Sequence, residues 1–167
     1  MARQTRQEII ARFRADMARL LAATDSIAED QRGHIVYDDW TIKELLAHIA
    51  AWDRELVRGL DQLLAGQRPA FASYEEAEFN ARAVEASRPL PFAEVLAGAR
   101  EAHETLVSRI EALTDEKWMR SAPHRWGGRA PITVASLFYY RYKGETHYGG
   151  HATEIESWAA RSGYVQP

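Results

Sequence analysis

Apolar residues recur every three or four positions along most of the chain, and this spacing predicts amphipathic helices. The first helix is expected around the apolar positions Ile9, Ile10, Phe13, Met17, Leu20 and Leu21. A connection of small and charged residues follows, from about 24 to 39. Thr41 and Glu44 have the spacing of a capping box, which predicts the start of a second helix. That helix is expected to end near Gly66 and Pro69.

The second half of the chain continues the helical pattern. Ser73 and Glu76 resemble another capping box, which predicts a shorter helix to about residue 85. Pro91 suits the first turn of a helix whose apolar face continues to Leu113. The long connection over 114–131 is expected to be a lid or rim over a site, or to contain a short helix over 114–119. The last helix is expected over 133–160.

No strand-like alternation of useful length and no internal repeat is visible in the sequence. The predicted fold class is therefore all-α. The simplest architecture is a four-helix bundle with long connections, formed by one domain over residues 1–167.

Composition narrows the function classes. The 167 residues are 46% hydrophobic and 27% charged, as in an ordinary globular domain. The formal net charge of −3, with acidic residues interleaved among the basic ones, predicts no nucleic-acid partner. No apolar run approaches the roughly 20 residues needed to span a bilayer, which predicts no membrane partner. The N-terminal segment does not resemble a signal peptide, so a cytoplasmic location is expected.

The chain contains no cysteine. This excludes disulfides, thiolate metal sites and a thiol nucleophile supplied by the protein. Any metal ion must be held by histidine, carboxylate, backbone or water, and any thiol chemistry must use a thiol from outside.

Three histidines are the principal candidates for a metal site. His147 and His151 lie four residues apart, so in a helix their rings leave the same face. A helical wheel places Tyr140 in the same arc, which faces the bundle interior. His48 flanks the apolar stripe of the second helix, where it would line a pocket beside Trp52. Three imidazoles with an open fourth position are typical of a catalytic zinc-type site. Hydrogen-bonded core histidines are the alternative, since the spacing is common by chance.

Gly149 and Gly150 lie between the paired histidines. Each glycine costs a helix interior roughly 1 kcal/mol relative to alanine. Close packing and access for a ligand are both consistent with this cost.

Further polar residues fall on interior faces. Asp53 lies in the apolar stripe of the second helix, where a carboxylate is costly unless it is paired. It is expected to support a metal-binding histidine from behind or to form an ion pair with a core arginine. His103 lies on the apolar face of the helix after Pro91. It could be a further metal ligand or a catalytic base, and the alternative is a hydrogen-bonded core histidine. Glu154 could act as a general base, and Tyr140 could offer its hydroxyl to a substrate. The alternative for Glu154 is a solvated charge on the helix surface, and the alternative for Tyr140 is a packing role.

Two segments resemble signatures of the DinB/YfiT-like superfamily. Residues Trp40–Trp52 are similar to its second-helix motif, and His147–Trp158 to its last-helix motif. The Thr114–Trp118 turn and the total length agree, so the resemblance covers nearly the whole chain. It implies a four-helix bundle and a divalent metal held by His48, His147 and His151. Residues 50–59, with Ala102 and His103, look closest to the ClbS/DfsB-like branch, which protects cells against reactive metabolites.

The resemblance also implies a class of activity. Some members of this superfamily transfer a small thiol such as bacillithiol, mycothiol or glutathione, and others are metal-dependent hydrolases. We therefore expect a transferase or hydrolase acting on a small molecule, with an external low-molecular-weight thiol as a candidate cofactor. All-nitrogen ligation favours zinc or nickel. The alternatives are a non-catalytic protein that sequesters a small molecule in a histidine-lined pocket and a structural bundle, which could be a homodimer through an exposed helix face.

Overall fold

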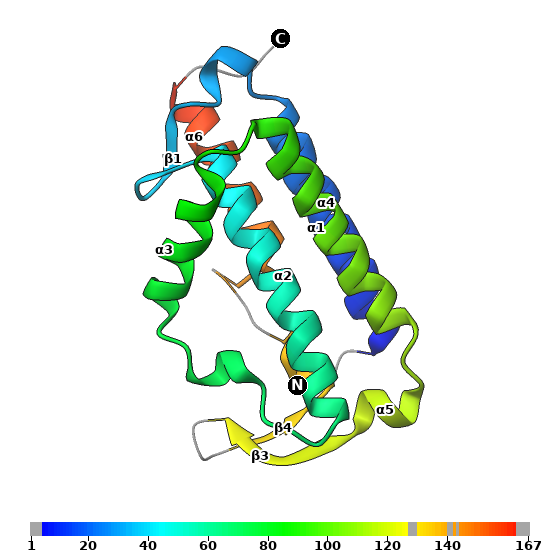
Figure 1. Ribbon diagram of the computed structural model, residues 1–167. Coiled ribbons are helices and arrows are strands. Elements are labelled where there is room, and N and C mark those ends of the chain that lie inside the picture. Colours follow the sequence, from blue (N-terminus) through cyan, green and yellow to red (C-terminus); the bar gives the residue numbers. More distant parts are fainter. Residues whose placement is uncertain (1–4, 127–129, 140–141, 143, 163–167) are drawn as a thin grey trace.

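The computed structural model describes residues 5–126, 130–139, 142 and 144–162. Within these residues, four long helices and two shorter ones form the molecule (Figure 1). The long helices are α1 (Arg6–Asp25), α2 (Ile42–Leu64), α4 (Phe92–Glu111) and α6 (His147–Ser162). The shorter helices are α3 (Glu76–Ser87) and α5 (Asp115–Met119). The predicted all-α class and bundle architecture are confirmed.

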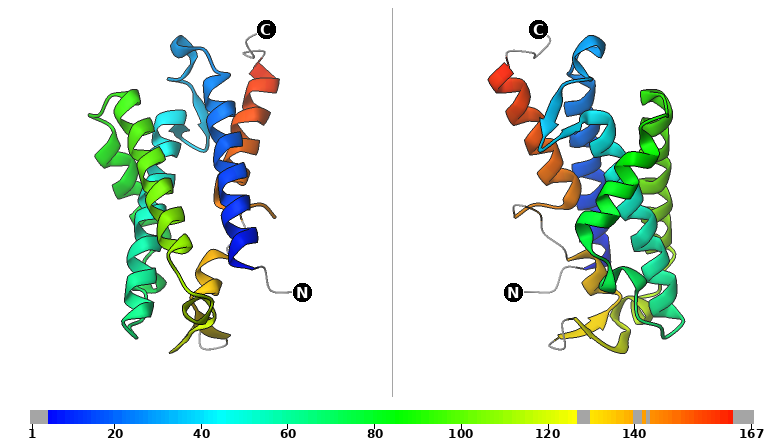
Figure 2. Two further views of the ribbon diagram at one scale, coloured as in Figure 1. Left: turned by 90° about the vertical axis from the view of Figure 1, so that its right-hand side faces the viewer. Right: turned by 60° about the vertical axis from the view of Figure 1, so that its left-hand side comes forward.

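The long helices pack as two neighbouring pairs. Figure 2 shows α1 beside α6 and α2 beside α4, and α3 lies outside α2. Fully buried side chains from all four long helices form the core between the pairs, among them Leu20, Leu45, Ile49, Leu106 and Ile155. Burying each such side chain stabilises the fold by about 1.5–3 kcal/mol. The apolar stripes of the sequence are therefore the faces that hold the bundle together.

Helix starts follow the capping rules in part. The Thr41 hydroxyl oxygen accepts a hydrogen bond from the Glu44 backbone N–H, and the Thr41 backbone N–H donates to Glu44 Oε2 at 2.8 Å, so the predicted capping box is confirmed. The capping box expected at Ser73 is wrong. Ser73 ends a 3-10 helix, η2 (Ala70–Ser73), and two extended residues separate it from α3. It therefore lies too far from the helix to cap it.

Two small antiparallel hairpins occupy connections in which no strand was expected. One joins β1 (Ile35–Tyr37) to β2 (Trp40–Thr41), just before α2. The other joins β3 (Ser121–Trp126) to β4 (Ala130–Thr133), at the end of the bundle near α5 (Figure 1). Strands of two to six residues are too short to produce a recognisable alternation.

The last helix begins later than the sequence predicted. Residues 130–133 form β4, Ala135–Phe138 form a 3-10 helix, η3, and α6 begins at His147. Leu137 and Phe138 are buried, so the apolar spacing reflects burial of a non-helical segment. Gly144 has a φ of +83°, which a helix cannot contain. Tyr140, which was placed on the histidine face, lies outside the described residues.

Thr146 fixes the start of α6. Its hydroxyl accepts a hydrogen bond from the backbone N–H of Gly149 at 3.1 Å and donates one to Asp16 Oδ2 at 2.6 Å. The first satisfies a free N–H of the helix start, and the second ties that start to α1. His147, the first residue of α6, is positioned by this link.

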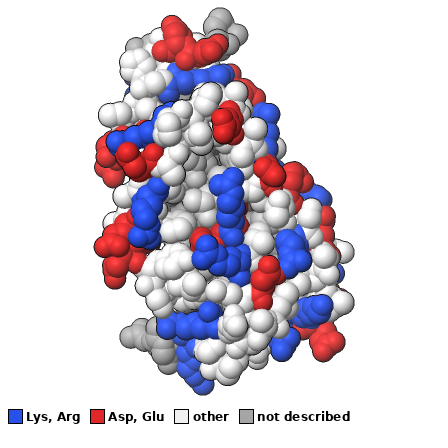
Figure 3. Space-filling model, in the orientation of Figure 1, with Lys and Arg blue, Asp and Glu red and all other residues white. Residues whose placement is uncertain are grey.

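Basic and acidic side chains are scattered together over the face of Figure 3, with acidic groups among the basic ones. Among the described residues, no helix is both long and apolar enough to cross a membrane.

Candidate metal centre

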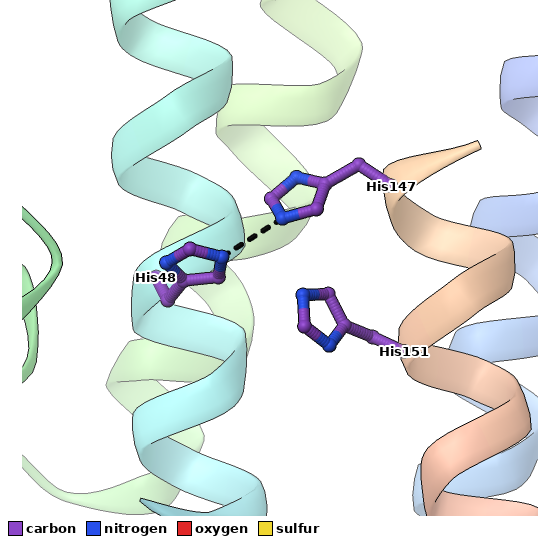
Figure 4. Close-up of side chains that lie close together, drawn as sticks. All are labelled: His48, His147 and His151. Atoms are coloured by element: carbon purple, nitrogen blue, oxygen red, sulfur yellow. Dashed lines mark hydrogen bonds between the residues drawn. The ribbon is translucent and has the colours of Figure 1, made fainter. Parts of the chain in front are cut away.

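The structure brings together the three histidines that the sequence singled out. His48 extends from α2, and His147 and His151 extend from successive turns of α6 (Figure 4). Each ring offers one nitrogen, and these nitrogens lie within 4.8 Å of one another. The Nε2 atoms of His48 and His147 are 2.8 Å apart. Two helices distant in sequence therefore direct three ligand atoms to one point.

The surroundings keep the imidazoles of His48 and His147 neutral. Burial, together with a smaller effect of the neighbouring His151, lowers the pKa of His48 to about 3. Burial, with His151 and His48 nearby, also holds the pKa of His147 well below its usual value. Neutral imidazole is the form that binds metal ions, because its free ring nitrogen carries a lone pair.

Glu154 orients His151. The Nδ1 atom of His151 lies 2.7 Å from Glu154 Oε2, and the Tyr142 hydroxyl donates to Glu154 Oε1 at 2.5 Å. A proton on Nδ1, held by the carboxylate, leaves Nε2 free for an ion. Burial and the hydrogen bond to Glu154 raise the pKa of Tyr142, so its hydroxyl stays protonated as the donor. Both Glu154 oxygens are thus hydrogen-bonded, and its role as a general base stays a prediction.

Aromatic rings enclose the histidines on the side of the first hairpin. The Trp40 ring lies 4.9 Å from that of His48, and the Tyr37 ring 5.7 Å from that of His151, between centroids. Tyr37 could not be recognised from its sequence pattern, because its strand is only three residues long. Trp40 directly precedes the helix cap Thr41, and this position next to the predicted start of α2 was the sequence signal for its place near His48.

The paired glycines serve close packing. A Cβ on Gly150 would overlap the Tyr142 ring and lie 3.1 Å from the Tyr142 carbonyl oxygen. A Cβ on Gly149 would lie 2.7 Å from Glu145 Oε2. Gly150 thereby lets Tyr142 reach Glu154, and the structure favours packing over ligand access.

A cavity of about 520 Å³ adjoins His48 and His147. This volume is within the range of small-molecule sites. Its wall is mainly apolar, with Phe13, Leu56, Phe71, Leu137 and Phe138 among its residues. Trp52 lines it as predicted, and its indole N–H donates to Asn80 Oδ1 at 2.9 Å. A small apolar molecule could therefore lie beside the histidines.

Asp53 also lines this cavity, and it does not contact the histidines as a hydrogen-bonding partner. It is 1% exposed and accepts a hydrogen bond from the Tyr148 hydroxyl at 2.7 Å. Burial raises the pKa of Asp53 to about 8, although Tyr148 and Arg54 act in the opposite direction. Among the described residues, its partner is thus a tyrosine and not the core arginine considered from the sequence.

His103 lies apart from the other histidines. It is buried on α4, with its ring centroid 5.0 Å from that of Tyr148, and it is not among the residues that line the cavity. Burial lowers its pKa, so it is neutral near pH 7. Its position is that of a core histidine packed behind Tyr148.

The three-histidine group fits a divalent metal ion. Three histidine nitrogen donors satisfy the usual ligand count of a catalytic zinc-type site and leave at least one position open. The carboxylate behind His151 is the support that such ligands normally have.

The comparisons with known proteins agree with this fold. The model of the DinB superfamily matches residues 12–152, which is most of the chain. The chain therefore belongs to the DinB superfamily. No curated protein matches it.

Solved structures share the fold at low sequence identity. YfiT from Bacillus subtilis, described as a probable metal-dependent hydrolase with an unusual four-helix bundle topology, is 19% identical, with a TM-score of 0.70 over 99% of this chain and 91% of that one. DfsB, a sibling lethal factor precursor, is 16% identical, with a TM-score of 0.75 over 95% and 97%. The colibactin self-resistance protein ClbS, solved with a double-stranded DNA, is 13% identical, with a TM-score of 0.70 over 92% and 94%. These likenesses show the shared fold, and membership of the ClbS/DfsB-like branch stays a prediction.

Proposed function

We propose that this protein is a divalent-metal-dependent enzyme that acts on a small, largely apolar molecule in detoxification or stress protection. The observation that carries the proposal is the convergence of three histidine nitrogens, within 4.8 Å of one another, beside a cavity of about 520 Å³. Zinc or nickel suits the all-nitrogen donors best. The reaction is hydrolysis, or transfer of an external low-molecular-weight thiol.

A divalent ion at this site supplies Lewis acidity, which lowers the pKa of a water or thiol and polarises an electrophile. The residues of the chain perform the remaining tasks. His48, His147 and His151 hold the ion, and Glu154 keeps the His151 ring in one orientation. The apolar cavity wall binds the body of the substrate and excludes water from it.

Two facts support this activity class. The description of YfiT as a probable metal-dependent hydrolase supports hydrolysis by a related fold. The absence of cysteine means that a thiol, if one reacts, comes from solution. We propose a small-molecule substrate, no nucleic-acid or membrane partner, a cytoplasmic location and a homodimer through an exposed helix face.

A second candidate is sequestration without turnover. It is favoured by the cavity itself, whose mainly apolar wall could retain a hydrophobic metabolite. The name of ClbS, a self-resistance protein with the same fold, is compatible with either activity.

The test is a turnover screen on untagged protein loaded with zinc or nickel. Aryl esters and amides are assayed without thiol, and aryl halides and epoxides with glutathione, bacillithiol or mycothiol. We expect turnover that is lost in His147→Ala and after chelation, but kept in the control His34→Ala, whose ring is exposed. Turnover that survives both chelation and His147→Ala contradicts the proposal. Tight binding of the compounds without turnover indicates sequestration.

A further inference from the structure

The cavity wall contains one buried oxygen without a hydrogen-bond partner. Tyr148 donates to Asp53 Oδ1 at 2.7 Å, but Asp53 Oδ2 has no partner among the described residues. Other polar side chains of the wall are bonded within the protein: Ser136 to the Thr133 carbonyl oxygen at 2.7 Å and Thr146 to Asp16 at 2.6 Å. Among the described residues of this wall, Asp53 Oδ2 and His48 Nδ1 are the buried side-chain atoms without a hydrogen-bond partner, and Asp53 is the one that lies outside the histidine group.

The surroundings determine the form of this carboxyl group. An ionised carboxylate with one donor in a mainly apolar wall would carry a desolvation cost of several kcal/mol. The side chain of Arg54, the adjacent cation on α2, donates a hydrogen bond to the Gly98 carbonyl oxygen on α4 at 3.4 Å. The raised pKa of Asp53, about 8, agrees with a neutral acid at pH 7. A neutral carboxyl that accepts from Tyr148 on Oδ1 carries its proton on Oδ2, where it is a donor.

We propose that Asp53 is a specificity-determining residue whose Oδ2–H donates a hydrogen bond to an acceptor, such as a carbonyl oxygen, on an otherwise apolar substrate. This inference rests on the proposed function, because it names the substrate class of that site. Asp53 follows His48 by five residues, which is roughly 7.5 Å along the axis of α2. The acceptor is therefore remote from the reacting bond beside the histidines. A buried donor left unpaired penalises ligands that lack an acceptor.

Three probes of one shape test this class of ligand: 2-acetylnaphthalene, 2-isopropylnaphthalene and 1-(2-naphthyl)ethylamine. Their affinities are measured by equilibrium dialysis at pH 7, and the ratio of ketone to hydrocarbon affinity cancels general packing effects. We expect this ratio to fall about tenfold in Asp53→Leu and to change less than about threefold in Asp53→Asn, whose amide can still donate. Glu55→Gln is the matched control on α2, because Glu55 is buried outside the cavity and bonded by Tyr74.

The infrared C=O stretch of the bound ketone gives a direct readout that needs no leucine variant. It should shift to lower frequency in the wild type and in Asp53→Asn. The proposal is overturned if the C=O stretch is unshifted or if the affinity ratio is unchanged in a folded Asp53→Leu variant. It is also overturned if none of the three probes binds, or if the protein prefers the amine and Asp53→Asn abolishes that preference.

Metal content is measured on the same samples. An unshifted stretch in a protein that binds metal overturns this inference alone. A shifted stretch in a protein that binds no metal supports the ligand class and counts against the proposed function.

Discussion

Glu154 holds His151 through a 2.7 Å contact between Oε2 and Nδ1, and the Tyr142 hydroxyl holds Glu154 in turn. The three groups form a chain from a non-helical segment, through α6, to the ring that completes the histidine group. Because Glu154 is 7% exposed and lies one turn after His151, the carboxylate is fixed before any ion binds. The orientation of the His151 ring is thereby a property of the fold.

Glu154→Gln should weaken metal binding about 10- to 100-fold, because the amide cannot accept the Nδ1 proton with the strength of a carboxylate. Competition with a chromogenic chelator measures this change. Glu156→Gln is the control, since Glu156 lies on the same helix and pairs with Arg19 away from the histidines. Equal affinities in the two variants would show that Glu154 does not support the ligand. If Glu154 is also a general base, turnover at saturating metal should fall as well.

Asp53 should make stability fall as pH rises. Its pKa is near 4 in the unfolded chain and about 8 in the folded protein, so the folded state alone keeps the proton between these values. The contribution of protonated Asp53 to the free energy of unfolding is fully present below about pH 4 and is lost as pH rises through about 8. Asp53→Asn removes this loss, and we expect it to be more stable than wild type at pH 7 by about 2–4 kcal/mol. Urea unfolding at pH 5 and pH 8 measures the difference, which should be larger at pH 8. A difference that does not change with pH would place the Asp53 pKa near its unfolded value.

Gly150→Ala should damage the histidine site by displacing Tyr142. The new methyl group would overlap the Tyr142 ring and approach its backbone, so we expect a loss of about 1–3 kcal/mol in the free energy of unfolding and weaker metal binding. Gly98→Ala is the control on α4, where a Cβ meets only the end of the Arg54 side chain. It should be neutral or stabilise by up to about 1 kcal/mol. If both variants behave alike, Gly150 is not needed for the approach of Tyr142.

Thr146→Ala should lower stability and metal affinity together. It removes the side-chain cap of α6 and the bond to Asp16, at a cost of about 0.5–2 kcal/mol. Thr5→Ala removes the cap of α1 at the far end of that helix and should cost similar stability without changing metal affinity. Calorimetric unfolding and metal titration of both variants separate the two effects. A metal affinity that is equal in the two variants would mean that the cap does not position His147.

Part of this site could be predicted from sequence because it depends on local geometry. The four-residue spacing of His147 and His151 places both rings on one face of α6, and the apolar stripe of α2 turns His48 inward. The helix start at Thr41 follows from two side chains three residues apart. These relationships are properties of single helices, so they can be recognised without the tertiary fold.

The rest depends on contacts between separate segments. The Tyr142–Glu154 bond joins α6 to a segment that was expected to be helical itself, and a helix over 133–160 would have turned Tyr142 to a different position. Tyr37 and Trp40 reach the histidines from a hairpin too short to recognise. The pairing of Asp53 with Tyr148 crosses from α2 to α6. No local pattern specifies such pairs.

The metal content of untagged protein at pH 7.5, measured by mass spectrometry of the elements before and after addition of zinc or nickel, tests the central claim most directly. Three converging imidazoles predict near-stoichiometric divalent metal in the wild type, and its loss in His48→Ala, His147→Ala and His151→Ala. His34→Ala should keep its metal, because that ring is exposed and outside the group. Metal absent from the wild type even after addition, or bound equally by the wild type and the three site variants, would contradict a three-histidine metal centre.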